Sequence, residues 1–238
     1  MAKVFAPSSR RFLTDQCVQG CRLAIDLGCG PGHTTRLLAD AVGAERTVGF
    51  DVSARYVASA ASNQPTLEFM VHDSMVVPFP IGPADVIYAR LLLAHLPEPD
   101  TVVARWLTQL TPGGRVLLDE IEYIRTTNQV LARYEEIVVA LVASGGGHMY
   151  AGPLLTELVN VVSDRVETYP VTTADAARMF RMNLEVWRPD EFIRRTYPTR
   201  QIDQLAAELD VLMASPATGE IEWGLRQIAL APSSRHSA

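Results

Sequence analysis

The sequence has few features that would direct it to nucleic acid or to a membrane. Its 21 lysine and arginine residues are outnumbered by 27 acids, and they form no basic run. Without a basic patch we expect no binding to nucleic-acid phosphates. No apolar stretch approaches the ~20 residues that cross a bilayer. The first residues also lack the apolar core of a signal peptide, so we expect a cytoplasmic protein.

Cysteine is also scarce. The only three are Cys17, Cys21 and Cys29, an odd number. The Cys17-x-x-x-Cys21 pair has no second pair of ligands to match it, so it does not indicate a metal site. We therefore expect reduced thiols and no bound metal.

What the sequence does have is a glycine-rich turn between an apolar strand and a helix. Residues 23–38 read LAIDLGCGPGHTTRLL, in which Asp26 is followed by Gly28, Gly30 and Gly32. Glycine permits positive φ and close approach of a ligand to the backbone. The helix that follows offers unpaired N–H groups and a positive dipole end. This pattern predicts a binding loop for a nucleotide-like ligand with an anionic group.

The loop departs from the two common nucleotide motifs. The third glycine of G-x-G-x-x-G is replaced by His33, which counts against an NAD-dependent oxidoreductase without excluding one. No Gly-Lys-Ser/Thr ends the loop, so it is not a P-loop. Asp26 would be unfavourable beside phosphates and suits a ligand with a positive group. S-adenosylmethionine has an ammonium, a sulfonium and a carboxylate, but no phosphate.

Two more acids follow the next two apolar segments. Asp51 ends the predicted strand 46–51, and Asp73 follows the predicted strand 67–71. An acid at the second strand tip can accept hydrogen bonds from both ribose hydroxyls. A carboxylate after the third strand can accept from an adenine amine. Three acids at successive strand tips, together with the glycine loop, favour a nucleoside site over isolated turn residues.

Taken together, these motifs resemble the class I S-adenosylmethionine-dependent methyltransferases, in their small-molecule branch. The resemblance covers about residues 20–122, from AIDLGCGPG through GFDVS, HDSMVVPFP and ADVIYARLLLAHLPEPD to LTPGGRVLLDEIE. It implies that S-adenosyl-L-methionine is the cofactor. The cofactor-binding residues that it implies are Asp26, Gly28, Cys29, Gly30, Gly32, Asp51, Val52, Asp73, Ser74, Met75 and Arg90.

The order of predicted elements indicates an α/β fold. Strands near 23–28, 46–51, 67–71, 84–89 and 114–121 alternate with helices near 33–42, 53–61 and 99–110. Such alternation predicts a parallel sheet covered on both faces. With strands at 165–171 and 221–231, we expect one domain over residues 1–238. This is a Rossmann-like, doubly wound, seven-stranded and mostly parallel sheet, in which the family's seventh strand runs antiparallel.

The second half of the sequence predicts helices rather than further motifs. Segments 127–143, 173–186 and 189–214 and a segment after Pro153 read as helical, with breaks at Pro189 and Pro198. We assign the insertions at about 123–163 and 172–219 to a helical lid over the active site. Lids of this kind keep water from the reaction.

No motif identifies the methyl acceptor. The fourth strand lacks the Asn/Asp-Pro-Pro-aromatic motif of nucleic-acid amino-methyltransferases and the acids of metal-dependent catechol enzymes, so we predict no base flipping and no metal. We expect O-methylation of a small-molecule hydroxyl or carboxyl in specialised metabolism. N- or C-methylation, and a protein that keeps the pocket without methylating, remain alternatives. We expect a monomer or homodimer.

The candidate catalytic residues follow from acid–base chemistry. A hydroxyl acceptor needs a base, whereas a carboxylate acceptor needs a cationic clamp. Arg178 and Arg181 would suit a clamp, beside a segment at 176–189 whose aromatic residues could line an apolar pocket. Glu120 and Glu122 are two residues apart on one face of the fifth predicted strand, so we expect both to emerge near the acceptor. The candidate bases and their neighbours are His148, His95, Glu122 and Tyr150.

Overall fold

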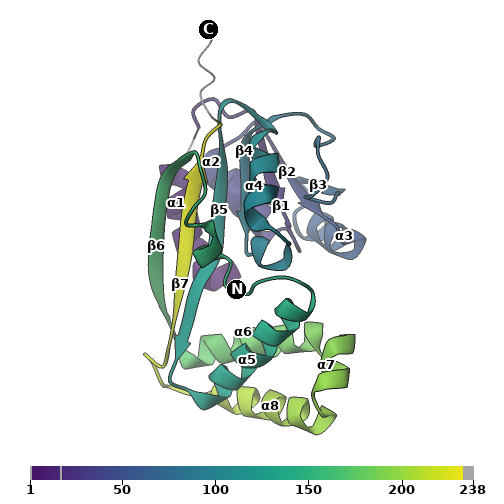
Figure 1. Ribbon diagram of the computed structural model, residues 1–238, viewed down its shortest axis with the longest axis vertical. Helices are drawn as coiled ribbons and strands as arrows, with labels where there is room; N and C mark the ends of the chain where they lie inside the picture. The colour runs from purple at the N-terminus through teal and green to yellow at the C-terminus, as the bar shows by residue number, and fades with distance from the viewer. Residues whose placement is uncertain (1, 17, 233–238) are drawn as a thin grey trace.

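A computed structural model describes residues 2–16 and 18–232, so Cys17 lies outside the described residues. A seven-stranded sheet with the order β3-β2-β1-β4-β5-β7-β6 forms its centre. The strand β7 is antiparallel to both of its neighbours, and the other paired strands are parallel. The predicted doubly wound, mostly parallel sheet is confirmed. Figure 1 shows the sheet above a separate group of helices.

The strands begin and end close to the predicted positions in the first half of the chain. They are β1 Leu23–Leu27, β2 Arg46–Asp51, β3 Glu68–Val71, β4 Ala84–Arg90, β5 Leu110–Thr126, β6 Val161–Val171 and β7 Ile221–Leu230. The strand β5 continues to Thr126, past the predicted end at 121, because it pairs with β7 from Val116 to Thr126. The strand β6 begins at Val161 rather than near 165 for the same reason, since it pairs along β7.

Alternating residues of the central strands pack into two separate cores. On one face, Ala24, Tyr88 and Leu117 pack with the helices α1 Ala2–Asp15 and α2 His33–Val42. On the other face, Ile25 and Ile87 pack with the helix α4 Pro99–Leu107. The helix α3 Ala54–Asn63 packs along β2 and β3. This period-2 burial is expected of strands covered on both sides.

The helix α1 was not predicted from the sequence. Pro7 lies inside it, and a proline removes one helical hydrogen bond. The helix nevertheless buries Phe5, Phe12 and Leu13 completely against the sheet. Burying a large apolar side chain stabilises a fold by roughly 1.5–3 kcal/mol, so three of them outweigh the proline.

Four helices lie in the segments that were predicted to form a lid, and we call them the lid helices. They are α5 Gln129–Ser144, α6 Thr173–Trp187, α7 Glu191–Thr196 and α8 Thr199–Leu212. Figure 1 shows them gathered beyond the ends of β5 and β7. The predicted helical segment 189–214 forms two helices with the predicted break at Pro198, which stands at the amino end of α8. The segment after Pro153 is only a short 3-10 turn, η2 Gly152–Leu155.

Glu220 ties the base of the lid together, just before β7. Its carboxylate accepts hydrogen bonds from Thr173 Oγ1 at 2.6 Å and Asn128 Nδ2 at 3.2 Å. Its backbone carbonyl accepts from Thr126 Oγ1 at 2.8 Å. The starts of α5 and α6 are therefore fixed to one residue at the end of the sheet. Among the described residues, no helix is long and apolar enough to cross a membrane.

Candidate functional site

The glycine loop lies between β1 and α2 with three residues at positive φ. Gly28, Gly30 and Gly32 have φ of 66°, 51° and 85°. A Cβ on Gly28 would lie 2.8 Å from a Leu92 methyl group, whereas one on Gly30 would meet nothing within 4 Å. The loop is therefore packed against the β4 turn at Gly28 and open at Gly30.

Asp26 holds this loop to the start of α2. One oxygen of its buried carboxylate accepts hydrogen bonds from Thr34 Oγ1 and Thr35 Oγ1, each at 2.7 Å. The other oxygen, Oδ1, is buried and has no hydrogen-bond partner. Burial raises the pKa of Asp26 to about 6. An unpartnered acidic acceptor beside a glycine loop fits a ligand with an ammonium group.

Asp51 ends β2 with both carboxylate oxygens facing backbone donors. Gly30 N donates to Oδ2 at 2.9 Å, and Ser53 N donates to Oδ1 at 2.8 Å. Each oxygen keeps a further lone pair for a ribose hydroxyl. The next residue, Val52, is 72% exposed, which is unusual for a large apolar side chain and fits a surface against which an adenine packs.

The segment after β3 forms a tight turn. Asp73 Oδ1 accepts a hydrogen bond from Met75 N at 2.8 Å. The carbonyl of the buried Ser74 accepts from Trp106 Nε1 at 2.8 Å, which anchors the turn to α4. This turn adjoins Asp51, because His72 N donates to the Asp51 carbonyl at 3.0 Å. The predicted ribose and adenine residues are thus neighbours in space.

Arg90 ends β4 beside a buried acid that sequence reasoning did not single out. Asp119 of β5 is fully buried and accepts a hydrogen bond from Ser9 Oγ of α1. Arg90 donates to the same Ser9 hydroxyl at 3.5 Å, and its charge acts on both Asp26 and Asp119. Burial raises the pKa of Asp119. Arg90 therefore balances two buried acids and links the glycine loop to α1.

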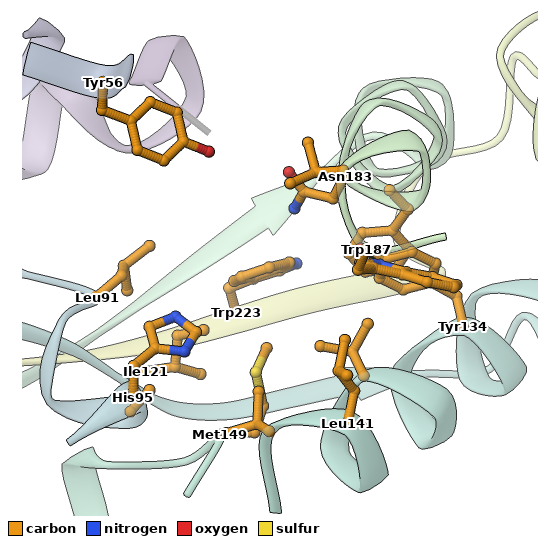
Figure 2. Close-up of a pocket in the computed structure, with 15 residues that line it drawn as sticks. Tyr56, Leu91, His95, Ile121, Tyr134, Leu141, Met149, Asn183, Trp187 and Trp223 are labelled. Carbon is orange, nitrogen blue, oxygen red and sulfur yellow. Dashed lines mark hydrogen bonds between the residues drawn. The ribbon is translucent and has the colours of Figure 1, made fainter. Parts of the chain in front are cut away.

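A cavity of about 340 Å³ lies between the carboxyl ends of the parallel strands and the lid helices. Figure 2 shows Tyr56 of α3, Leu91 and His95 on one side, and Tyr134, Asn183 and Trp187 of the lid on the other. The cavity adjoins the glycine loop, because Leu92, which packs on Gly28, follows the lining residue Leu91. The complete lining is Tyr56, Leu91, Ala94, His95, Ile121, Tyr134, Val138, Leu141, Val142, Met149, Phe180, Asn183, Val186, Trp187 and Trp223.

The lining is aromatic and uncharged. Tyr134 stacks on Phe180 with ring centroids 3.9 Å apart, and Trp223 lies 6.0 Å from Phe180. None of the described lining residues is a lysine, arginine, aspartate or glutamate. Such a cavity suits an apolar or aromatic molecule, since an ion would lose its hydration without gaining a partner.

His95 brings a titratable group to the cavity. It ends the 3-10 turn η1 Leu93–His95, and its side chain is exposed and lines the cavity. Desolvation of the charged form lowers the pKa of His95. The imidazole is therefore neutral at pH 7 and can accept a proton.

The other three catalytic candidates are not among the residues that line this cavity. Glu122 does not fit a catalytic role, because its carboxylate forms two hydrogen bonds with Arg226 at 2.7 and 3.0 Å. The Tyr150 hydroxyl donates a hydrogen bond to the Glu135 carboxylate. His148 has an exposed side chain, and its backbone N–H donates to the Ala94 carbonyl.

The neighbouring acid Glu120 supports the turn that carries His95. Its Oε1 accepts hydrogen bonds from Leu92 N and Leu93 N, both at 2.9 Å, while Oε2 is buried without a partner. Burial raises the pKa of Glu120 to about 8. The sequence placed Glu120 and Glu122 near the acceptor, but β5 turns Ile121 toward the cavity instead.

The predicted arginine clamp is also absent from this cavity. Arg178 pairs with Asp175 at 3.0 Å, and Arg181 pairs with Asp210 at 3.0 Å and with Glu185. The aromatic segment 176–189 does contribute Phe180 and Trp187 to the lining. The lining residues Trp223, Tyr134 and Tyr56 had no local signal, because only the packing of distant elements brings them together.

Comparison with known proteins finds similarity in the first half of the chain. A model of the methyltransferase domain family matches residues 24–114. The trans-aconitate 2-methyltransferase of Methylobacterium radiotolerans is 40% identical over 93 residues, which is 39% of this chain and 35% of that protein. The same enzyme of Azoarcus sp. is 39% identical over 90 residues, or 38% and 35%. The matched part thus spans about a third of the length of these relatives.

Solved structures have a similar fold at low sequence identity. Phosphoethanolamine N-methyltransferase 2 of Haemonchus contortus, in complex with S-adenosyl-L-methionine, has a TM-score of 0.58 at 17% identity and covers 94% of this chain and 52% of its own. The cyclopropane synthase MmaA2 of Mycobacterium tuberculosis has a TM-score of 0.60 at 16% identity, with 94% and 83% covered. At these identities the likeness establishes a common fold.

Proposed function

Because the chain carries a class I S-adenosylmethionine-dependent methyltransferase domain, we propose that it methylates a small, uncharged acceptor held between the domain and its lid. One observation carries this proposal. An apolar cavity of about 340 Å³ adjoins the open glycine loop, so a donor on the loop and an acceptor in the cavity would be neighbours. Holding two reactants together in this way is the main contribution that an enzyme makes to a displacement reaction.

We assign the cofactor to the edge formed by the ends of β1, β2 and β3. When bound, S-adenosylmethionine supplies a methyl group on a positively charged sulfur. Asp26 and the loop from Gly28 to Gly32 would hold its methionine end, with Arg90 near the carboxylate. Asp51 would bind the ribose hydroxyls, with Val52 against the base. Asp73, Ser74 and Met75 would bind the adenine edge. The buried, unpartnered Asp26 Oδ1 and the open space at Gly30 support this assignment.

We propose O-methylation of a hydroxyl, with His95 as the base. His95 is the described histidine that lines the cavity, and its lowered pKa keeps the imidazole ready to take a hydroxyl proton at neutral pH. A bound acceptor would displace water from the apolar walls beside His95, which would strengthen the interaction between imidazole and hydroxyl.

A carboxyl acceptor, as the name of the trans-aconitate relatives indicates for them, is less well supported. Their matched segments span 35% of their length, and aconitate is a polycarboxylic acid. No described lining residue carries a positive charge to pair with a carboxylate. We therefore propose that this chain and those relatives differ in acceptor while sharing the donor.

Two measurements test the proposal. Calorimetric titration should show binding of S-adenosylhomocysteine and no binding of NADH. Transfer of a labelled methyl group from S-adenosylmethionine should be detectable with hydroxylated aromatic compounds and weaker with trans-aconitate. Binding of NADH without S-adenosylhomocysteine would overturn the cofactor assignment, and labelling of trans-aconitate alone would overturn the acceptor class.

A further inference from the structure

The aromatic wall of the cavity contains a hydrogen-bond donor without a partner. Nε1 of Trp223, on β7, is buried and has no hydrogen bond, and the residue is 2% exposed. An indole N–H can only donate, and leaving it unpaired in the interior costs roughly 1–3 kcal/mol. Figure 2 shows the nitrogen edge of Trp223 turned toward Asn183 and Trp187.

The position of this donor is fixed from several sides. The backbone of Trp223 pairs with Ile124 of β5 and Tyr169 of β6. Its ring packs 5.1 Å from Phe5 of α1 and 6.0 Å from Phe180 of α6, between ring centroids. A side chain held by four elements cannot turn its N–H toward water without disturbing the core.

A second indole in the same wall provides an internal comparison. Trp187 also lines the cavity, but its Nε1 donates to the Tyr134 hydroxyl at 3.4 Å. The two side chains are chemically identical and nearly equally buried. They differ in that the Trp187 N–H has a hydrogen-bond partner in the protein and the Trp223 N–H has none.

We propose that the acceptor is a flat, uncharged aromatic molecule with a carbonyl or ether oxygen that accepts a hydrogen bond from Trp223 Nε1. This inference rests on the proposed function and deepens it, because the same molecule presents its hydroxyl to His95. The apolar lining excludes a charged ring substituent, and the volume of about 340 Å³ is in the range of small-ligand sites. The acceptor therefore carries two polar groups, one at each side of the cavity.

Three matched naphthols test this inference. They are 6-acetyl-2-naphthol, which has the carbonyl, 6-ethyl-2-naphthol, which lacks it, and 6-hydroxy-2-naphthoate, which is charged. Their binding is measured by calorimetry with and without S-adenosylhomocysteine. We expect the acetyl compound to bind about tenfold more tightly than the ethyl compound, as one satisfied buried donor implies. The carboxylate should bind more weakly than both.

Two variants locate the preference. Trp223→Phe keeps an aromatic ring but removes the N–H, so the acetyl and ethyl compounds should bind it equally. Trp187→Phe is the matched control and should retain the tenfold preference. Thermal unfolding of both variants checks the fold, and the comparison of compounds on the unaltered protein stands even if Trp223→Phe unfolds.

Several results would overturn the inference. They are equal binding of the acetyl and ethyl compounds, a preference that persists in Trp223→Phe, tighter binding of the carboxylate, or no binding of any naphthol. Failure of the proposed function is a different result. In that case the acetyl preference would be present, but no labelled methyl group would reach the hydroxyl.

Discussion

The donor edge and the acceptor cavity are built in opposite ways. The proposed donor edge consists mostly of acids and glycines between Asp26 and Arg90, near the ends of β1 to β4. The cavity draws its lining from Tyr56 to Trp223, and that lining is mostly apolar. The proposed donor site is therefore encoded in short segments of sequence, whereas the proposed acceptor site depends on how distant elements pack.

The largest effect should come from the proposed base in the acceptor cavity. We expect His95→Ala to lower kcat about 10²- to 10⁴-fold, as the loss of a general base does. The affinity for S-adenosylhomocysteine should change less than about twofold, because His95 lies outside the donor edge. Steady-state kinetics with a hydroxylated acceptor and calorimetry measure the two quantities.

The pH profile provides a second readout for His95. Its lowered pKa predicts that kcat rises with pH only below about 6.5 and is level above it. His148→Ala tests the other candidate histidine. An equal loss of activity in that variant, with full activity in His95→Ala, would transfer the role to His148.

A smaller effect is expected at the donor edge. Asp51→Ala should weaken binding of S-adenosylhomocysteine by about 1–3 kcal/mol, because hydrogen bonds to a carboxylate are lost. Asp85→Ala is a matched control, since Asp85 also accepts from two backbone N–H groups but at the opposite end of its strand. Calorimetry should show loss of affinity only for Asp51→Ala. Equal losses would indicate a general destabilisation.

How much the sequence could predict follows the same division. Alternation of apolar residues and the strand-tip acids are local patterns, so the bounds of β1 to β4 and the neighbouring positions of Asp51 and Asp73 were predictable. The helix α1 was missed because Pro7 argues against a helix at this position. Only the contacts of α1 with the sheet account for its formation. The same holds for Trp223, whose place in the cavity depends on pairing with β5 and β6.

Glu122 shows why a local pattern can mislead. Its spacing from Glu120 predicted that both acids would face the acceptor, as i and i+2 residues of a strand share a face. They do share a side of the strand, but it is the side away from the cavity. There Arg226 donates hydrogen bonds to Glu122, and backbone N–H groups at the η1 turn donate to Glu120. The alternation of a strand gives two faces without saying which one is functional.

The pH dependence of stability tests the support beneath His95. The raised pKa of Glu120, about 8, means that the folded state binds this proton more tightly than the unfolded state. Its contribution to stability is therefore complete below about pH 4.5 and is lost as the pH rises to about 8. We expect Glu120→Gln to reduce this slope by about 1 kcal/mol per pH unit, measured by chemical denaturation.

Other acids with raised pKa values also make the stability depend on pH, so their contribution has to be separated from that of Glu120. Asp26 and Glu135 have raised pKa values of about 6 and about 7, so part of the slope below pH 7 should remain in Glu120→Gln. Above pH 7 the slope should come mainly from Glu120. An unchanged slope between pH 7 and 8 would show that Glu120 ionises normally in the folded protein.

The smallest effect should come from two ion-paired arginines of the lid helices. Arg178→Ala and Arg181→Ala remove ion pairs on the surface, so each should change the free energy of unfolding by less than about 1 kcal/mol. Binding of 6-acetyl-2-naphthol should not change. Loss of acceptor binding in either variant would show that an arginine reaches the acceptor and would blur the division between the two regions.

The hydrogen bonds of Glu220 mark a place in the chain at which helices of the lid could be exchanged. The segment 172–220 leaves the sheet after Val171 and returns at Ile221, and these two residues are paired on neighbouring strands. A segment whose ends already meet can be lengthened, shortened or replaced without moving the strands on either side. We therefore expect that α6, α7 and α8 can be replaced together by helices from another protein, provided that Glu220 and its hydrogen-bond partners are kept. Such a graft would change the acceptor and leave the proposed donor edge unaltered.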